Sequence, residues 1–429
     1  MNLLLIWLGK LINKLSNQFN LGSGSTWPGH IALNFDNNFS KQLLRNSKVK
    51  IIVIAGTNGK TTTAKLVRTV LEARGKKVLY NETGANLENG LASTLIQGSD
   101  IFGNLNYDYL IFESDENTLP LILKKLNPNF LILLNLFRDQ LDRYGEIDSI
   151  SKKWKDSLNK LNKGTVIVAN ADDSTIAYTA QKSGLKTFFF GLDDYKNRVY
   201  KVPHGADAIY CPNCNKDLYF KYINFSHVGD WFCKNCGLKR PTLDISQFNY
   251  YPLAGAYNRY NTLAAVLFAK ILGLTDTEIV NSLKKFSPAF GRQEKLMING
   301  KSVQLFLSKN PTSFNESLKT ISDLGAKNIV IVLNDRIPDG RDVSWIWDTN
   351  LEPLKKLKRI YISGDRVWDF VLRTKYALGN LRNIQSFENL TRTLSLALKE
   401  TPKNQILYIL PTYSAMLEVR KSLTGRKIL

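Results

Sequence analysis

The chain has 429 residues, of which 44% are hydrophobic and 22% are charged, and these values exclude both a short peptide module and an intrinsically disordered chain. The length leads us to expect two or three domains. Lys and Arg outnumber Asp and Glu by 58 to 37, and the resulting net charge of +21 predicts a surface that attracts phosphates, acidic lipid head groups or nucleic acid.

The first segment, residues 1–19, predicts an amphipathic helix. Its apolar residues recur at helical spacing, with Leu4, Leu8, Leu11 and Leu15 in one stripe that Ile12 and Phe19 widen. The run Leu3–Leu8 is too short for a membrane span, and its flanks do not have the features of a signal peptide. This helix either packs on its own domain or lies on a membrane surface.

A parallel sheet is predicted next. The β-branched run Val49–Ala55 ends in a glycine turn that leads into a helical pattern. Further short strands are expected at Val78–Tyr80, Tyr109–Glu113, Phe130–Leu134 and Thr165–Ala169. Because helix-length segments separate several of these strands, we expect an α/β fold with a doubly wound parallel sheet. Residues Val202–Leu243 lack periodicity and indicate an insertion before a helical pattern resumes at Asn261–Leu272.

A second alternating series begins near Lys301 and predicts a smaller α/β domain. Its strands are expected at Val303–Leu307, Ile329–Leu333, Arg359–Ser363 and Gln405–Leu410. We therefore expect three regions: an N-terminal lead-in over 1–45, a central domain over 46–297 with an insertion over 202–243, and a C-terminal domain over 298–429.

The turn after the first strand has the composition of a phosphate-binding loop. It reads Gly56, Thr57, Asn58, Gly59, Lys60, Thr61 and Thr62. Glycines let backbone N–H groups surround a phosphate, while Lys60 can reach the β- and γ-phosphate oxygens and the Thr61 hydroxyl can bind Mg²⁺. Ile54 replaces the first glycine of the longer form of this motif. The structural alternative is an ordinary glycine turn before a helix.

Glu113 is the candidate magnesium carboxylate. It ends a predicted strand, at the edge where open parallel sheets bind their ligands, and a carboxylate there can hold Mg²⁺ directly or through water. Asp115 and Glu116 compete for this role. The alternative for all three is a charge cluster at a helix N-terminus.

The insertion contains all four cysteines of the chain, in two pairs separated by eighteen residues. The pairs are Cys211 with Cys214 and Cys233 with Cys236. This spacing predicts a structural zinc ribbon in a reducing compartment, because four thiolates leave no position for water. We expect His204 and His227 to be surface residues. Four unligated thiols are the alternative.

Several segments in order resemble the Mur ligase superfamily of ATP-dependent, amide-forming enzymes. Besides GTNGKTT, they are NLFRDQLDRYG (135–145), NADDS (170–174), AGAYNRYNTLAA (254–265) and FGRQE (290–294). The resemblance implies a nucleotide site near Asn258 and Asn261, with Asn258 at the adenine or ribose, although helix capping is an alternative for either residue. It also implies that Arg292 neutralises charge at the γ-phosphate.

The sequence departs from that superfamily at several positions. Gln140 and Tyr257 stand where Mur ligases carry histidines, which puts a second metal site in doubt. The carbamylated lysine is assigned to none of the three lysines near its expected place, Lys152, Lys153 and Lys155. We expect no sugar-nucleotide-binding domain ahead of the phosphate loop, and Asn310-Pro311 replaces the acidic residue expected near an incoming amino acid.

These departures, the insertion and the segment 333–348 resemble the MurT branch of the superfamily. That resemblance implies a synthetase subunit that activates the α-carboxylate of D-Glu in the lipid II stem peptide with ATP. Ammonia from a GatD-like class I glutaminase, the partner in a heterodimer, then gives D-isoglutamine. The resemblance also implies that Asp342 completes the Cys-His pair of that glutaminase. The rivals of Asp342 are Asp335, Asp339 and Asp348, and the alternative is a solvated turn residue.

The resulting hypothesis is an enzyme with catalytic Lys60, Glu113 and Asp342 that uses ATP, Mg²⁺ and Zn²⁺. It is expected in the cytoplasm, with peripheral contact to the inner membrane leaflet, where the substrate lies. Trp345 and Trp347 contact either the partner or the core. One alternative is a stand-alone Mur-type ligase for an amino acid. A second is a zinc-ribbon nucleic-acid-binding ATPase, but no recognition motif accompanies the basic charge, so no nucleic acid is expected.

Overall fold

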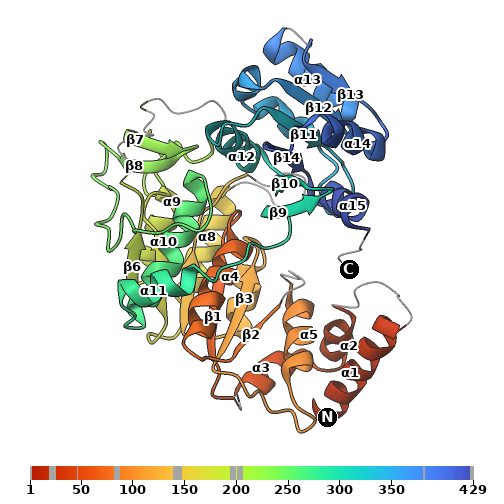
Figure 1. Cartoon of the computed structure of the whole chain (residues 1–429). Coiled ribbons are helices and arrows are strands. Elements are labelled where there is room, and N and C mark those ends of the chain that lie inside the picture. The colour runs from red at the N-terminus through yellow and green to blue at the C-terminus, as the bar shows by residue number, and fades with distance from the viewer. Residues whose placement is uncertain are drawn as a thin grey trace. The chain divides into compact units, whose positions relative to one another are not determined.

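The computed structural model describes residues 2–18, 26–45, 47–81, 87–138, 147–193, 200, 206–379 and 382–425. These residues form two compact units (Figure 1). The first unit holds the described residues up to 138, those from 147 to 252, and 258–286; the second holds 253–257 and the described residues from 287 onward.

The first unit is built on a six-stranded sheet in which every neighbouring pair of strands is parallel. The strand order is β2-β3-β1-β4-β5-β6. The strands are β1 Lys50–Ala55, β2 Val78–Tyr80, β3 Tyr109–Ser114, β4 Phe130–Leu133, β5 Val166–Asn170 and β6 Lys186–Phe190. The predicted doubly wound α/β fold is therefore confirmed.

Helices cover both faces of this sheet, since every residue of β1 after Lys50 is buried. One face packs on a core to which α5, α6 and α8 contribute, and α4 contacts β1, β2 and β3. The helices are α1 Asn2–Gln18, α2 Trp27–Phe35, α3 Phe39–Arg45, α4 Lys60–Ala73, α5 Glu88–Gly98, α6 Leu119–Lys125, α8 Ile147–Leu158, α9 Ser174–Lys182, α10 Ala256–Ile271 and α11 Asp276–Leu283.

The N-terminal helix α1 forms as predicted and packs on α2 and α5, but through a different face (Figure 1). Leu5 and Ile6 are buried, whereas Leu4, Leu8 and Leu11 of the predicted stripe are exposed. Residues 3–8 are apolar all around the helix, so helical spacing alone did not decide which face packs on the domain.

The insertion contains an antiparallel hairpin of β7 Tyr219–Phe225 and β8 Val228–Phe232. The prediction that His227, in its turn, is a surface residue is wrong, because this side chain is fully buried. Its ring centroid lies 4.8 Å from that of Phe137, and its Nε2 lies 3.4 Å from Asp173 Oδ2. The His227 side chain in this turn is therefore packed in the protein interior and not exposed to solvent. His204 lies outside the described residues.

The second unit contains another six-stranded sheet, ordered β13-β12-β11-β14-β10-β9. All neighbours are parallel except the pair of β9 and β10. Its strands are β9 Arg292–Ile298, β10 Lys301–Phe306, β11 Asn328–Val332, β12 Arg359–Ser363, β13 Ile384–Ser386 and β14 Ile406–Pro411. Asn299 and Gly300, both with positive φ, form the two-residue turn between β9 and β10.

Two hydrophobic clusters fill the second unit, and each includes side chains of different helices. Residues of α12 and α13 belong to one cluster, and residues of α14 and α15 belong to the other. The helices are α12 Pro311–Asp323, α13 Val367–Leu378, α14 Leu390–Glu400 and α15 Tyr413–Thr424, with the short 3₁₀ helices η1 Ser344–Asp348 and η2 Glu352–Lys356.

Candidate nucleotide site and metal centre

The loop between β1 and α4 adopts a backbone that requires both of its glycines. Gly56 and Gly59 have φ of +148° and +91°. A Cβ atom on Gly59 would lie 2.1 Å from Asn261 Oδ1, and one on Gly56 would lie 3.0 Å from the backbone of Asn135. The loop therefore leads directly into the N-terminus of α4 at Lys60, which is a favourable place for an anion.

Lys60 holds its ammonium group within this loop. Its Nζ donates to the carbonyl oxygens of Gly56, at 2.7 Å, and Thr57, at 3.1 Å. The same atom pairs with Asp115 Oδ1 at 2.9 Å. A buried lysine with these partners places a positive charge at the carboxyl ends of the strands, where a phosphate can exchange for the carboxylate of Asp115.

Thr61 and Glu113 come together beside Lys60. The Thr61 hydroxyl donates to Glu113 Oε2 at 2.8 Å, and the Tyr80 hydroxyl donates to Glu113 Oε1 at 2.5 Å. Of the two competing carboxylates, Asp115 pairs with Lys60, and Glu116 Oε1 accepts from the Thr57 hydroxyl at 3.3 Å. The Thr61 hydroxyl and the Glu113 carboxylate are oxygen ligands of the kind that Mg²⁺ accepts.

The remaining loop residues are fixed by the segment that follows β4. Thr57 is buried, and its Oγ1 accepts from the backbone N–H of Phe137 at 3.0 Å. Asn58 N donates to Asn135 Oδ1 at 2.9 Å. Thr62 is buried in the first turn of α4. The buried Thr57 side chain thus fixes the position of the loop through its hydrogen bond to the segment after β4.

Asn258 and Asn261 lie together at the start of α10. Both are buried, and Asn261 Nδ2 donates to Asn258 Oδ1 at 3.2 Å. Asn261 Oδ1 in turn accepts from the Thr63 hydroxyl of α4 at 3.4 Å. Asn258 is inside a helix that begins at Ala256, so it is not the N-cap residue.

Sequence reasoning missed Tyr80 and Asn135 as parts of this site. Tyr80 ends β2, which is next to β3, and therefore lies at the same sheet edge as Glu113. Asn135 is the first residue of the segment 135–145 that resembles the Mur ligases. In that segment the resemblance concerned the metal-binding position at Gln140 and not Asn135. Gln140 lies outside the described residues.

Other residues singled out in the sequence belong to the second unit or to α8. Arg292 begins β9 of the second unit. The Tyr257 hydroxyl accepts from Gln293 Nε2 at 2.9 Å within that unit. Asn310 caps α12 and accepts from Ser313 N at 2.8 Å. The lysines of α8 differ in exposure, since Lys152 and Lys153 are exposed and Lys155 lies over the ring of Tyr178.

Asp342 lies exposed in the connection between β11 and η1. Hydrogen bonds from the side chain and the backbone N–H of Ser344 hold the pKa of Asp342 below its usual range. Among its rivals, Asp339 is buried and accepts from Ser414 N at 2.8 Å, and Asp335 accepts from Arg366 at 2.9 Å. The third rival, Asp348, is exposed at the end of η1.

The two tryptophans near Asp342 have different surroundings. Trp345 packs against the core cluster of the second unit, with its ring 5.9 Å from that of Phe314. Trp347 is exposed, and the Arg373 guanidinium lies 5.6 Å from its ring centroid. Trp347 is therefore the member of the pair that a partner can reach.

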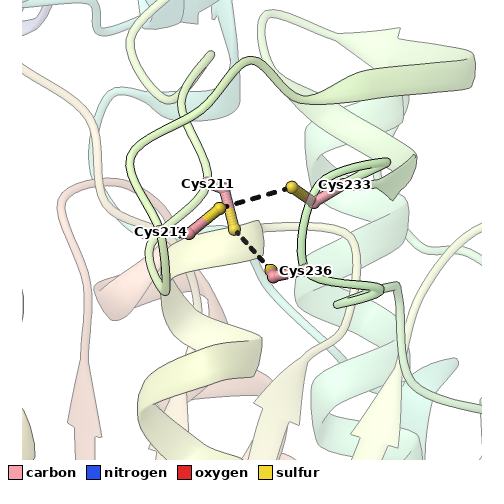
Figure 2. Close-up of side chains that lie close together, drawn as sticks. All are labelled: Cys211, Cys214, Cys233 and Cys236. Carbon is pink, nitrogen blue, oxygen red and sulfur yellow. Dashed lines mark hydrogen bonds between the residues drawn. The ribbon is translucent and has the colours of Figure 1, made fainter.

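The four cysteines converge at the base of the β7–β8 hairpin, as Figure 2 shows. All four sulfur atoms lie within 4.8 Å of one another, and Cys211–Cys236 and Cys214–Cys233 are each 3.6 Å apart. These separations exclude disulfides and match the ~3.8 Å between thiolates around a tetrahedral zinc with ~2.3 Å bonds. The residues therefore fit a four-thiolate metal.

A buried ion pair connects the insertion to the NADDS segment (170–174). Arg240 Nε lies 2.7 Å from Asp172 Oδ1, and the hydroxyl of Tyr260 donates to Asp172 Oδ2 at 2.5 Å. Burial raises the pKa of the Asp172 carboxyl to about 6, against the opposing effect of Arg240. The positive charge of Arg240 thus compensates the negative charge of the Asp172 carboxylate, which solvent does not reach.

We expect Arg240→Met to destabilise the fold by about 3 kcal/mol near pH 8, because it leaves Asp172 ionised and unpaired in the interior. The folded-state pKa of Asp172 is already above its unfolded value and rises further in this variant. In the wild type this group loses its contribution to stability as the pH rises through about 6, and in the variant the loss continues above pH 6. The deficit of the variant is therefore smaller near pH 5, where the carboxyl is protonated. Urea unfolding at both pH values measures this. The matched control is Lys239→Met at the exposed neighbouring position, and a deficit independent of pH contradicts the prediction.

Two family models match this chain, one in each of its two units. Residues 54–269 match the Mur ligase middle domain, and residues 307–416 match the MurT ligase C-terminal family. The MurT subunit of lipid II isoglutaminyl synthase (glutamine-hydrolyzing) of Streptococcus pneumoniae is 31% identical over 429 residues, covering 95% of this chain and 94% of that protein. The same subunit of Staphylococcus aureus is 33% identical over 391 residues, with 87% of each chain covered.

Among solved structures, a pseudomurein peptide ligase type C from Methanothermus fervidus has a similar fold. Its TM-score is 0.66 at 20% identity, covering 90% of this chain and 80% of that structure. The fold and the match to the Mur ligase middle domain together define an ATP-dependent ligase of the Mur type. Within this class, the chain belongs to the MurT family.

No helix among the described residues has the length and apolar character that a membrane crossing needs.

Proposed function

We propose that this chain is the synthetase subunit of a lipid II isoglutaminyl synthase, which amidates the α-carboxylate of D-Glu in the stem peptide. The observation that carries the proposal is the phosphate loop, in which Lys60 lies at the carboxyl edge of the sheet and Thr61 contacts Glu113. The names of the two MurT relatives support the substrate and the use of glutamine.

The proposed reaction has two steps. A carboxylate oxygen of the substrate attacks the γ-phosphorus of ATP, the bond from that phosphorus to the ADP oxygen breaks, and an acyl phosphate forms. Ammonia then attacks the acyl carbon, phosphate leaves with the electrons of the C–O bond, and the nitrogen loses a proton. The activation is needed because a carboxylate is a poor electrophile at neutral pH.

We assign the triphosphate to residues 56–62, with Lys60 at the β- and γ-phosphate oxygens. The buried Asn258 is proposed for the adenine or ribose, and Arg292 for the charge that develops on the γ-phosphate. Thr61 and Glu113 are proposed to hold Mg²⁺, which when bound neutralises phosphate charge. Tyr80 orients the carboxylate of Glu113 through its hydroxyl.

The proposed partner is a GatD-like class I glutaminase in a heterodimer, with Asp342 orienting the catalytic histidine of that subunit. The exposure of Asp342 and its lowered pKa support this role, since the group must be ionised and reachable. The proposed domains remain 1–45, 46–297 and 298–429. We propose a cytoplasmic location with peripheral contact at the inner membrane leaflet, and no nucleic-acid partner.

Zn²⁺ is the metal proposed for the four cysteines. We expect Cys233→Ser to reduce bound zinc from about one per chain to near zero, because the site has no spare ligand, and to lower the thermal midpoint of unfolding. Atomic emission after dialysis and a thermal scan measure the two effects. Wild-type protein treated with a chelator should match the variant, and full zinc retention by the variant would show that the ligand set is wrong.

One assay tests the proposed activity against a stand-alone amino-acid ligase. The chain, with and without a glutaminase subunit, is incubated with ATP, magnesium and a soluble lipid II analogue, and is given ammonia, glutamine or amino acids. Amide formation from ammonia without the partner, and from glutamine only with it, is expected. Product formation solely from an amino acid overturns the proposal.

A further inference from the structure

The outward face of α1 exposes apolar side chains that nothing in the described structure covers. The inward face is closely packed: Leu5 and Ile6 are buried, and a Cβ atom on Gly9 would lie 2.9 Å from Ile96 Cγ2 of α5. On the outward face, Leu4 and Trp7 are 67% and 55% exposed. An exposed apolar face on a helix whose other face is already packed indicates a surface that binds another molecule.

A neighbouring turn extends this surface. Ile101 and Phe102 follow α5, and both are largely exposed. The indole N–H of Trp7 donates to the carbonyl oxygen of Ile101 at 2.8 Å, and the Lys10 ammonium contacts the carbonyl oxygen of Ser99. The helix and the turn thus form one fixed surface. We call it the apolar patch, and it consists of Leu4, Trp7, Leu8, Leu11, Ile101 and Phe102.

A polar groove adjoins the patch. It has a volume of about 780 Å³, and Leu3 and Phe102 form part of its wall. Lys48 and Lys77 also line it, and Asp108 is the acidic residue among its described lining residues. The Asp108 carboxylate accepts from the backbone N–H of Lys77 at 2.8 Å and pairs with the Lys76 ammonium. Lysines therefore border the apolar side chains.

We propose that this face lies on an anionic lipid bilayer, with the apolar patch among the upper acyl chains and Lys48 and Lys77 among the head groups. The proposal rests on the proposed function in that the substrate is lipid-linked. Charge favours a bilayer as the occupant, because α1 contains Lys10 and Lys14 and no Asp or Glu. An interfacial helix combines an outward apolar face, a tryptophan at the boundary and flanking lysines in this way.

Vesicle co-sedimentation of the full chain with its partner subunit tests this. The vesicles contain either equal parts phosphatidylglycerol and phosphatidylcholine or phosphatidylcholine alone. We expect wild-type protein to bind the anionic vesicles, and the triple variant Leu4→Glu, Leu8→Glu, Leu11→Glu to bind at least tenfold more weakly. These positions are exposed, so the fold is retained. A double variant, Lys48→Glu with Lys77→Glu, should weaken binding to the anionic vesicles.

The matched control is Leu121→Glu with Leu372→Glu, at exposed leucines of α6 and α13, and it should bind as wild type does. Amidation of a water-soluble substrate analogue is measured on the triple variant and should be unchanged, so that failure of the proposed function and failure of this proposal are distinguishable. Equal vesicle binding by wild type and triple variant, or none by wild type, overturns the proposal. So does loss of self-association or partner binding in the triple variant without a change in vesicle binding.

Discussion

Lys60→Ala is expected to remove measurable ATP binding and to reduce amidation by at least about 10²–10³-fold. The ammonium group of Lys60 is held between two loop carbonyls and Asp115, so its position is set before the nucleotide arrives. Its removal takes away the positive charge held inside the proposed phosphate loop and leaves Asp115 to repel a phosphate there. Calorimetric titration with ATP in the presence of magnesium measures the binding, and product formation from ammonia measures turnover.

Two controls accompany this variant. Lys76→Ala removes a lysine that pairs with Asp108 at the surface and should bind ATP normally. Partner binding by Lys60→Ala, followed by size-exclusion chromatography, should also be unchanged, because Lys60 and Asp342 belong to different units. If Lys60→Ala binds ATP as tightly as the wild type does, the assignment of the loop is wrong.

Asp342→Ala is expected to reduce glutamine-dependent amidation by about 10³–10⁴-fold, by analogy with the loss of a triad's orienting carboxylate. Amidation from free ammonia should persist, since under the proposed mechanism that reaction bypasses the glutaminase, in which Asp342 would act. Asp342 suits this role because it is exposed and ionised, with Ser344 fixing one of its oxygens. The ratio of the two activities, measured on the same preparation with the partner present, is the readout.

Asp348→Ala serves as the matched control, because it removes another exposed carboxylate from the same segment. It should leave both activities near their wild-type values. An Asp342→Ala variant that loses both activities equally has a folding defect or a different role, and one that loses neither shows that another residue supplies the carboxylate.

The parts of the structure that follow from local sequence were predictable. Strands β1 to β5 are short apolar runs bounded by turns, and their alternation with helices determines a parallel sheet. The glycine turn of 56–62 was predictable because two glycines and a lysine stand between a strand and a helix, and phosphate binding at this turn stays a prediction. The cysteine spacing was equally informative, and the four sulfur atoms do converge.

The remaining features depend on contacts between distant segments. The sequence around His227 resembles an exposed hairpin turn, and only the packing of its ring on Phe137 explains its burial. The outward face of α1 is set by where α2 and α5 lie, which helical spacing does not encode. By contrast, an Asn-Gly pair is a local signal for a two-residue hairpin turn, so the β9–β10 hairpin at Asn299-Gly300 could have been predicted from the sequence.

The contacts of the hairpin have a consequence for shortened versions of this protein. The N–H of Gly229 and the indole of Trp231 donate to the carbonyl oxygens of Asp172 and Ala171, at 3.0 Å and 2.9 Å. These two acceptors follow the end of β5 directly, so the hairpin supplies hydrogen-bond donors at the carboxyl edge of the sheet. Excising the ribbon to obtain a shorter protein would leave the carbonyl groups of Ala171 and Asp172 without these two donors, and a replacement hairpin would have to supply both.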